Sequence, residues 1–414
     1  MEKEFITIRR RETAIRVQNT QIDAVRLKDI TKQGVRVYEN GKIGITGTLG
    51  NGSREKLVDQ AVENLGAGIC YPYPLSGPQR EHRCYNEQPM TPEEVHAVSE
   101  SVLAVLGKEY PDFSFSETIA AEETVEEMNN TRGLDLEYKD SLFSLGLLLK
   151  EKKSANLIDG FLSYQGRRFE ADKFWAFNHS LLEAYRTEAR LPAKETLPVF
   201  FLEGPLFAFL ARSLHGERYA TGSSIFSGKM GEKLFNERVA LELNRDPHTY
   251  MGAFFDREGT VLKDDRLALI EGGRLKNVLT DKKTADQYNL PHTGAASGEY
   301  DERPGLASSR QGPVPLHFKT DSPNLAAALG GQTAILAVMS SGGDLTPDGT
   351  FAAPVQISFL TDGKKLLGKL PEFTVRSHLY KMLGEDYIGT FDNDLYYLSD
   401  APTQLQGYNL SILL

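Results

Sequence analysis

The sequence predicts an α+β fold, in which a sheet with covering helices is followed by a mostly β, glycine-rich second half. Two observations support this prediction. The first fifty residues alternate between apolar and polar side chains, and an amphipathic helix with a clear start follows them. Alternation with a period of two is typical of strands that have one solvated face. The helix then provides an apolar stripe that covers the other face of the sheet.

The predicted N-terminal sheet ends in a hairpin and leads into a helix. Its strand-like runs lie at residues 5–8, 14–17, 22–27, 34–38 and 42–46. Asn40 and Gly41 join the last two runs, and this dipeptide is the strongest short-range signal for a hairpin. Ser53 is a predicted helix N-cap. The apolar residues that follow it share one helical face: Leu57, Val58, Ala61 and Leu65.

Residues 66–90 are predicted to form a long exposed loop, because prolines and charged residues interrupt the periodicity. His82 and Cys84 lie close together in this loop, so a metal site has to be considered. No second Cys or His pair stands at ligand spacing, and we therefore expect no metal there. A second helix is predicted to begin after Thr91, because Thr91 and Glu94 form a capping box around Pro92.

In the middle of the chain, the sequence predicts long strands at 134–150 and 156–164. A turn at 129–133 connects the first of these strands to the strand before it. A helix over 173–190, capped by Asp172, follows. Two prolines and several charges at 190–198 mark the predicted domain boundary. We expect an N-terminal α+β domain at 1–190 and a C-terminal mainly β domain at 196–414. Strand-like runs of the second domain lie at 199–202, 239–243, 267–271, 334–338 and 355–359, with a short helix at 282–288.

Composition and charge restrict the class of protein. The chain has 414 residues, of which 40% are hydrophobic and 25% charged, so it is long enough to bury a sizeable core. A net charge of −10 disfavours a broad phosphate-binding surface, so we expect no nucleic-acid partner. No apolar run approaches the roughly 20 residues of a membrane span, and the first residues lack a signal peptide. Cys70 and Cys84 give no disulfide framework, so we expect a cytoplasmic protein that does not contact the membrane.

Several glycine-containing turns of the second half occur in a characteristic order. They are Thr-Gly-Ser-Ser at 221–224, Phe-Asp-Arg-Glu-Gly at 255–259, Ile-Glu-Gly-Gly-Arg-Leu at 270–275, His-Thr-Gly-Ala-Ala at 292–296 and a late glycine-rich stretch at 342–351. Each alone is a turn that glycine chemistry dictates. Together, their order and spacing resemble the TldD/PmbA family, also called modulators of DNA gyrase. The N-terminal hairpin resembles the same family, so the resemblance covers nearly the whole chain.

The resemblance implies a position for a zinc site, on the short apolar helix before residue 221. In the TldD branch this helix carries a His-Glu-x-x-x-His motif, whose histidines hold zinc together with a C-terminal cysteine. The matching positions hold Phe207, Ala208 and Arg212. These side chains neither ligate zinc nor accept a proton, and an arginine repels a dication. No cysteine follows Cys84. We therefore expect no metal, no cofactor and no catalytic residue at this helix.

Two nearby residues remain as weak remnant candidates, His215 and Glu217. Positions two apart on a helix diverge by about 200°, which disfavours a catalytic pair. With no ligand role to hold them outward, Phe207, Phe209 and Leu210 are expected to pack in the core. The chain also has no Gly-x-Ser-x-Gly elbow, Walker loop or dinucleotide fingerprint.

The resemblance implies a non-catalytic, PmbA/TldE-like subunit of a TldD/PmbA-type metalloprotease complex that degrades or processes peptides. Its expected partner is a TldD-like zinc protease subunit in a heterodimer, and a homodimer is the alternative. Two other functions stay open at the level of sequence. One is an autonomous peptidase of the family with unrecognised catalytic residues. The other is a pure interaction protein, such as a gyrase-associated modulator.

Overall fold

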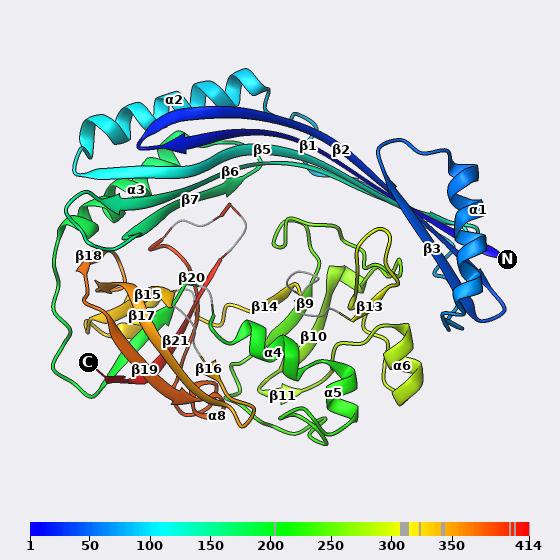
Figure 1. Ribbon diagram of the computed structural model, residues 1–414. Helices are drawn as coiled ribbons and strands as arrows, with labels where there is room; N and C mark the ends of the chain where they lie inside the picture. Colours follow the sequence, from blue (N-terminus) through cyan, green and yellow to red (C-terminus); the bar gives the residue numbers. More distant parts are fainter. Residues whose placement is uncertain are drawn as a thin grey trace.

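The structure is a computed structural model that describes residues 1–202, 204–306, 314–322, 324–340, 344–396, 399–400 and 403–413. Long strands of the N-terminal half form a curved sheet that arches over the C-terminal half (Figure 1). The C-terminal half contains further sheets and short helices. The predicted α+β fold is therefore confirmed.

The N-terminal sheet has seven strands in the order β3-β2-β1-β5-β6-β4, with β7 also paired to β6. Its strands are β1 (Glu2–Gln18), β2 (Gln21–Glu39), β3 (Lys42–Leu49), β4 (Gln79–Cys84), β5 (Phe113–Asn130), β6 (Leu134–Glu151) and β7 (Gly160–Gly166). Two pairs of short predicted runs are each one continuous strand, β1 and β2. The charged residues between the runs stay in the sheet because they pair across strands, as Arg11 does with Asp29 at 3.2 Å.

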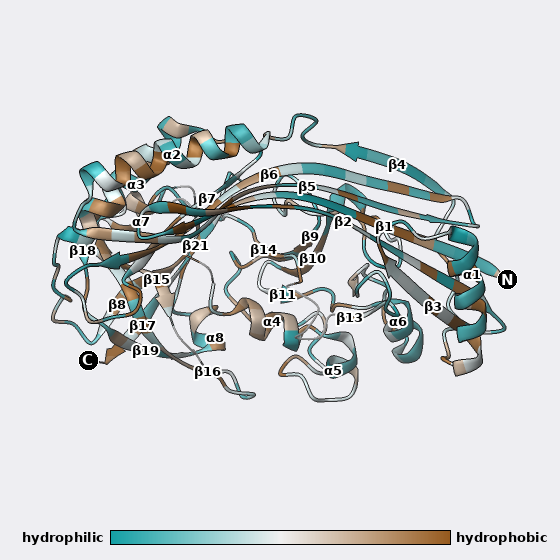
Figure 2. Cartoon of the chain, turned by 45° about the horizontal axis from the view of Figure 1, so that its top comes forward, coloured by the Kyte–Doolittle hydropathy of each residue, from teal (hydrophilic) through white to brown (hydrophobic). Residues whose placement is uncertain are grey.

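The predicted loop at 66–90 contains a strand that the sequence did not indicate. β4 pairs in parallel with β6, so that Gln79 lies opposite Leu134 and Cys84 opposite Lys139. Its sequence, Gln-Arg-Glu-His-Arg-Cys, has no apolar alternation because β4 is an edge strand, and charged side chains are common on sheet edges. Figure 2 shows β4 as mainly hydrophilic. His82 contacts Asp135 across this pairing, at 3.0 Å.

Three helices accompany the sheet: α1 (Arg54–Asn64), α2 (Pro92–Glu109) and α3 (Ala171–Arg186). The Ser53 cap and the Thr91 capping box are both present as predicted. The third helix differs from its prediction: its N-cap is Glu170, not Asp172, and it ends at Arg186 rather than residue 190. The chain leaves the helix early because Ala189 forms a backbone hydrogen bond with Lys369 of the C-terminal half.

The C-terminal half contains an eight-stranded sheet that follows the path β15-β8-β21-β19-β17-β16, in which β18 pairs with β17 and β20 with β21. Its strands are β8 (Thr196–Phe201), β15 (Ala334–Ser340), β16 (Asp344–Leu345), β17 (Thr350–Thr361), β18 (Leu366–Lys369), β19 (Phe373–His378), β20 (Tyr387–Asp392) and β21 (Gln404–Leu413). The strands predicted at 334–338 and 355–359 are thus present with longer bounds. The strand predicted at 199–202 begins earlier, at Thr196, and ends one residue sooner, at Phe201. Residues 342 and 343 of the late glycine-rich stretch lie outside the described residues.

Among the described residues, two smaller sheets and five short α-helices complete this half. The small strands are β9 (Leu241–Asn244), β10 (Arg266–Glu271), β11 (Arg274–Leu275), β12 (Ala296–Ser297), β13 (Gly305–Leu306) and β14 (Leu316–Phe318). The helices are α4 (Phe207–Ser213), α5 (Gly216–Ala220), α6 (Lys282–Tyr288), α7 (Leu325–Leu329) and α8 (Leu379–Met382). The predicted helix at 282–288 is confirmed as α6, with Asp281 as its N-cap. Among the described residues, no helix combines the length and apolar character required to cross a membrane.

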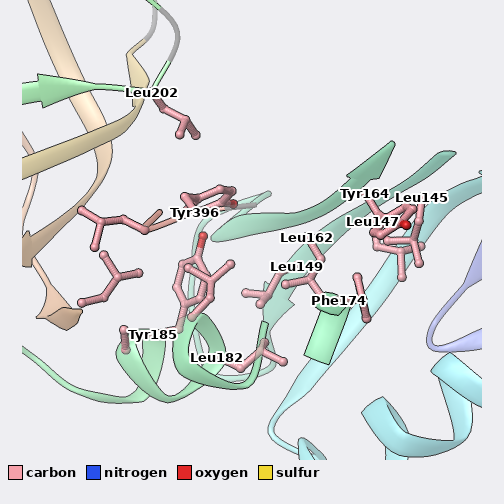
Figure 3. Close-up of a cluster of buried hydrophobic side chains, with 14 of the residues drawn as sticks. Leu145, Leu147, Leu149, Leu162, Tyr164, Phe174, Leu182, Tyr185, Leu202 and Tyr396 are labelled. Carbon is pink, nitrogen blue, oxygen red and sulfur yellow. The ribbon is translucent and has the colours of Figure 1, made fainter. Parts of the chain in front are cut away.

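One hydrophobic core crosses the predicted domain boundary. Leu149, Leu162 and Tyr185 of the N-terminal half belong to the same buried cluster as Leu202 and Tyr396 (Figure 3). The Tyr396 hydroxyl also donates a hydrogen bond of 2.5 Å to the carbonyl of Phe161. The predicted domains 1–190 and 196–414 are therefore joined by packing as well as by the chain, and the division of the chain into these two domains stays a prediction.

Candidate functional site

The segment that corresponds to the zinc motif forms two short helices rather than one. α4 ends at Ser213, and α5 begins at Gly216. His215 lies between them as the N-cap of α5, with extended backbone angles φ −62° and ψ 120°. The prediction that placed His215 and Glu217 on a common helix is therefore wrong for His215. The chain leaves the helical conformation there because it forms a backbone bridge between His215 and Leu279.

The apolar residues of α4 are partly as predicted. Phe209 is 5% exposed and Leu210 is fully buried, so both lie in the core. Phe207 is only half-buried, and its ring lies 5.4 Å from that of Phe318. Phe207 packs against the same core cluster but stays partly exposed, so the expectation of core packing holds for it only in part.

The three motif positions lie on the less buried side of α4, where a reaction site would be accessible. Ala208 and Arg212 are both more open than the core residues of this helix, beside the half-buried Phe207. The Arg212 guanidinium lies over the Phe209 ring at 5.2 Å, and its Nη2 is 3.5 Å from the carbonyl of Leu345. A methyl group, a phenyl ring and a guanidinium offer no lone pair to a metal ion. The residues present at this helix therefore do not fit zinc.

No other ligand completes a site at α4 in the described part of the chain. Cys70 and Cys84 are exposed free thiols of the N-terminal half. Glu217 is exposed on α5. The Nδ1 atom of His215 is buried without a hydrogen-bond partner among the described residues. Burial lowers the pKa of His215, so its imidazole is neutral at neutral pH.

A different group of potential ligands meets where the C-terminal half contacts the N-terminal sheet. Among the described residues, Asp256, Glu258 and His292 bring three candidate ligand atoms within 4.8 Å of one another. Asp256 and Glu258 are buried at 1% and 2% exposure, and His292 is more open. The sequence marked both of their turns, 255–259 and 292–296, but gave no sign that they meet. The available signal was limited to residue type: two carboxylates two positions apart, Asp256 and Glu258, and a histidine in the second turn, His292.

The oxygens of this group already have partners within the protein. Asp256 Oδ1 accepts hydrogen bonds from the amides of Glu258 at 2.9 Å and Thr260 at 2.8 Å. Its Oδ2 accepts a third, from the amide of Ala296 at 3.0 Å. Three backbone donors are the bonding pattern of a carboxylate that shapes a turn. Asp256 therefore orders the two glycine-containing segments against each other.

Glu258 connects these segments to the N-terminal half. It accepts hydrogen bonds from the Tyr71 hydroxyl at 2.5 Å and from the amide of Lys282 at 2.9 Å, and His292 Nε2 lies 3.2 Å away. Burial raises the pKa of Glu258, although the bonds from His292 and Tyr71 oppose this. For His292 burial lowers the pKa, but the bond to Glu258 and the nearby carboxylates outweigh it, so its pKa is raised. Through the Tyr71 hydrogen bond, the group contributes to the contact between the two halves of the molecule.

The fold and the sequence place this protein in a class of metallopeptidase-like proteins. The model of the PmbA/TldA metallopeptidase C-terminal domain matches residues 201–403, and the model of PmbA/TldA metallopeptidase domain 1 matches residues 4–65. The chain belongs to the PmbA/TldD family. The resemblance noted in the sequence is thereby confirmed.

Relatives and solved structures agree with this assignment. An uncharacterised protein of Methanocaldococcus jannaschii is 24% identical over 315 residues, which cover 73% of this chain and 72% of that protein. TldE from Thermococcus kodakarensis has a TM-score of 0.77 at 16% identity, over 100% of this chain and 97% of that one. A candidate modulator of a DNA gyrase from Thermotoga maritima also has a TM-score of 0.77, at 18% identity, over 99% and 96%. These structures show that the fold is shared along the whole chain.

Proposed function

We propose that this chain is a non-catalytic, PmbA/TldE-like subunit of a two-chain peptidase, whose partner is a TldD-like chain that holds zinc. The observation that carries the proposal is the open side of α4. It presents Phe207, Ala208 and Arg212 at the positions where a zinc motif requires two histidines and a glutamate.

The side chains of α4 lack the groups that a zinc-dependent hydrolytic site requires. Hydrolysis by zinc needs three protein ligands, a free position for water and a base that takes the proton of that water. At α4 none of these groups is provided by the described side chains. The Arg212 guanidinium adds a positive charge where a dication would have to bind, and this charge is permanent at any physiological pH.

The family architecture supports a structural role beside an active relative. The long sheet arches over the C-terminal half (Figure 1). Residues of both halves line a polar cavity. In a complex, such a chain would form part of the wall around a peptide substrate and would position the zinc-bearing subunit. An interface that encloses substrate in a permanent complex commonly buries more than about 2,000 Å².

The rival function is an autonomous peptidase, and the group formed by Asp256, Glu258 and His292 favours it over a pure interaction protein. These are carboxylate and imidazole groups within 4.8 Å of one another. One observation argues against an autonomous peptidase: every carboxylate oxygen of Asp256 and Glu258 already accepts a hydrogen bond from within the protein. The two functions therefore predict different results in one assay.

The test compares peptide cleavage by this chain, by a TldD-like chain and by a mixture of both, with an unstructured peptide as substrate. We expect the mixture to cleave, and the isolated chain to be inactive with or without added zinc. Glu258→Gln in this chain is the discriminating variant. It should leave the activity of the mixture intact if the fold is preserved, which circular dichroism checks. Cleavage by the isolated chain that Glu258→Gln abolishes would establish the autonomous peptidase instead.

A further inference from the structure

A polar cavity of about 400 Å³ lies between the long sheet and the C-terminal half. One wall comes from β1, β5 and β6, and the other from the loops around Tyr250, Arg257 and Gly298. Its volume falls in the range of about 300–1,000 Å³ that is typical of sites for small ligands. It lies apart from α4, since no residue of that helix lines it.

The carboxylates that line this cavity already have ion-pair or hydrogen-bond partners within the protein. Arg257 bonds Glu126 at 2.9 Å, and Arg167 bonds Asp140 at 2.8 Å. Asp256 accepts its three backbone hydrogen bonds, as described above. The two more exposed carboxylates also pair, Glu122 with Arg10 at 4.0 Å and Glu299 with Lys32 at 3.3 Å. The acidic side chains therefore leave no strong demand for a cation in the cavity.

Arg245 is the exception among the charged groups of the lining. It is 8% exposed, and it forms no ion pair with any described carboxylate. Its two hydrogen bonds are long and go to backbone carbonyls, from Nε to Gly294 at 3.4 Å and from Nη1 to Phe255 at 3.3 Å. By contrast, the still more buried Arg36 bonds Glu4 at 3.0 Å. Arg245 is thus a buried cation that lacks a bonded anion.

A buried cation destabilises the folded protein unless a group of negative charge compensates for it. An arginine stays protonated in proteins, so burial cannot be relieved by loss of the proton. Burial lowers the pKa of Arg245, and the negative charge of Asp256 opposes this only in part. Tyr250 also lines the cavity, and its hydroxyl makes no hydrogen bond with a described residue. A guanidinium and a hydroxyl with free donors therefore face the same polar space.

We propose that this cavity is a binding site for a carboxylate group, held by Arg245 and assisted by the Tyr250 hydroxyl. A guanidinium donates two parallel hydrogen bonds to a carboxylate, which is the geometry for which arginine is best suited. The carboxylate can belong to a short peptide with a free C-terminus or to a small organic acid. The site lies within this chain alone and does not depend on a zinc-bearing partner.

The test is calorimetric titration of the full-length chain with three ligands: N-acetyl-trialanine, its C-terminal amide and acetate. We expect the peptide acid to bind and its amide to bind about ten- to a hundredfold more weakly, since a hydrogen-bonded charge is lost. If acetate binds as tightly as the peptide acid, the ligand is a small acid and the carboxylate site stands. If neither acid binds, or if the amide binds as well as the acid, the proposal is wrong.

Variants assign the binding to the named residues. Arg245→Gln should abolish binding of the acid, and Arg212→Gln, which removes the same charge on distant α4, should bind like the unaltered chain. Equal binding by Arg245→Gln would refute the proposal. Should Arg245→Gln not fold, Tyr250→Phe decides the matter, because this residue is 38% exposed and tolerates the change. A several-fold loss of affinity in Tyr250→Phe supports the site, and unchanged affinity overturns it.

Discussion

The two phenylalanines of α4 provide a matched test of the packing around the altered motif. Phe209 is 5% exposed and belongs to the core cluster that includes Leu210 and Leu214, whereas Phe207 is half-buried. Replacement of a fully buried phenylalanine by alanine costs about 3–5 kcal/mol, from lost burial and the cavity left behind. We therefore expect Phe209→Ala to lower the free energy of unfolding by that amount.

Phe207→Ala should have a smaller effect, about 1–2 kcal/mol, because part of the ring is already in contact with solvent and the main loss is its contact with Phe318. The assay is urea denaturation followed by fluorescence and circular dichroism, with the slope of each transition compared between variants. An effect of Phe207→Ala equal to or larger than that of Phe209→Ala would refute the placement of these two side chains.

Three further predictions follow from the site. The purified chain should hold no stoichiometric zinc by elemental analysis, and one zinc per chain that is lost in His292→Gln would show that the 256–258–292 group binds metal. Tyr71→Phe should lower the free energy of unfolding by about 1–3 kcal/mol, because it leaves a buried oxygen of Glu258 without its donor, and an unchanged midpoint in denaturant would contradict this. The contact between His292 and Glu258 should stabilise the protein at low pH, because both pKa values are raised in the folded state. The folded protein then binds more protons than the unfolded one, so this contribution is present below about pH 6.5 and is lost as pH rises through the raised pKa of His292. The difference in melting temperature between the unaltered chain and His292→Gln should accordingly shrink from pH 6 to pH 9, and a difference that grows with pH would reverse the assigned sign.

Features fixed by neighbouring residues were accessible from the sequence. The caps at Ser53 and Thr91 each depend on a residue within three positions, and both are present. The cap predicted at Asp172 was wrong, because α3 begins after Glu170, which makes no side-chain cap bond. The Asn40–Gly41 hairpin is equally local, with both residues at positive φ. The family could be recognised for the same reason, because its signature is a series of turns, each defined by a few adjacent residues.

Features that depend on distant partners were missed. β4 has no strand pattern of its own and exists because β6 pairs with it. The charged centre of β1 lies in the sheet beside residues of opposite charge on β2 and β5. The meeting of Asp256, Glu258 and His292, and the position of Arg245 without a bonded carboxylate among the described residues, arise from the packing of the two halves against each other. No local pattern reports such long-range contacts.

The most direct test of the central proposal removes catalysis from one subunit at a time within the two-chain complex. The partner would carry glutamine in place of the glutamate of its His-Glu-x-x-x-His motif, and this chain would carry Glu258→Gln in a separate complex. Peptide cleavage and complex formation would be measured for both, the latter by size-exclusion chromatography. The proposed function predicts that the altered partner abolishes cleavage while the complex persists, and that the altered chain has full activity. Full cleavage by the complex with the altered partner would contradict the proposed function, since the reaction would then have to take place in this chain.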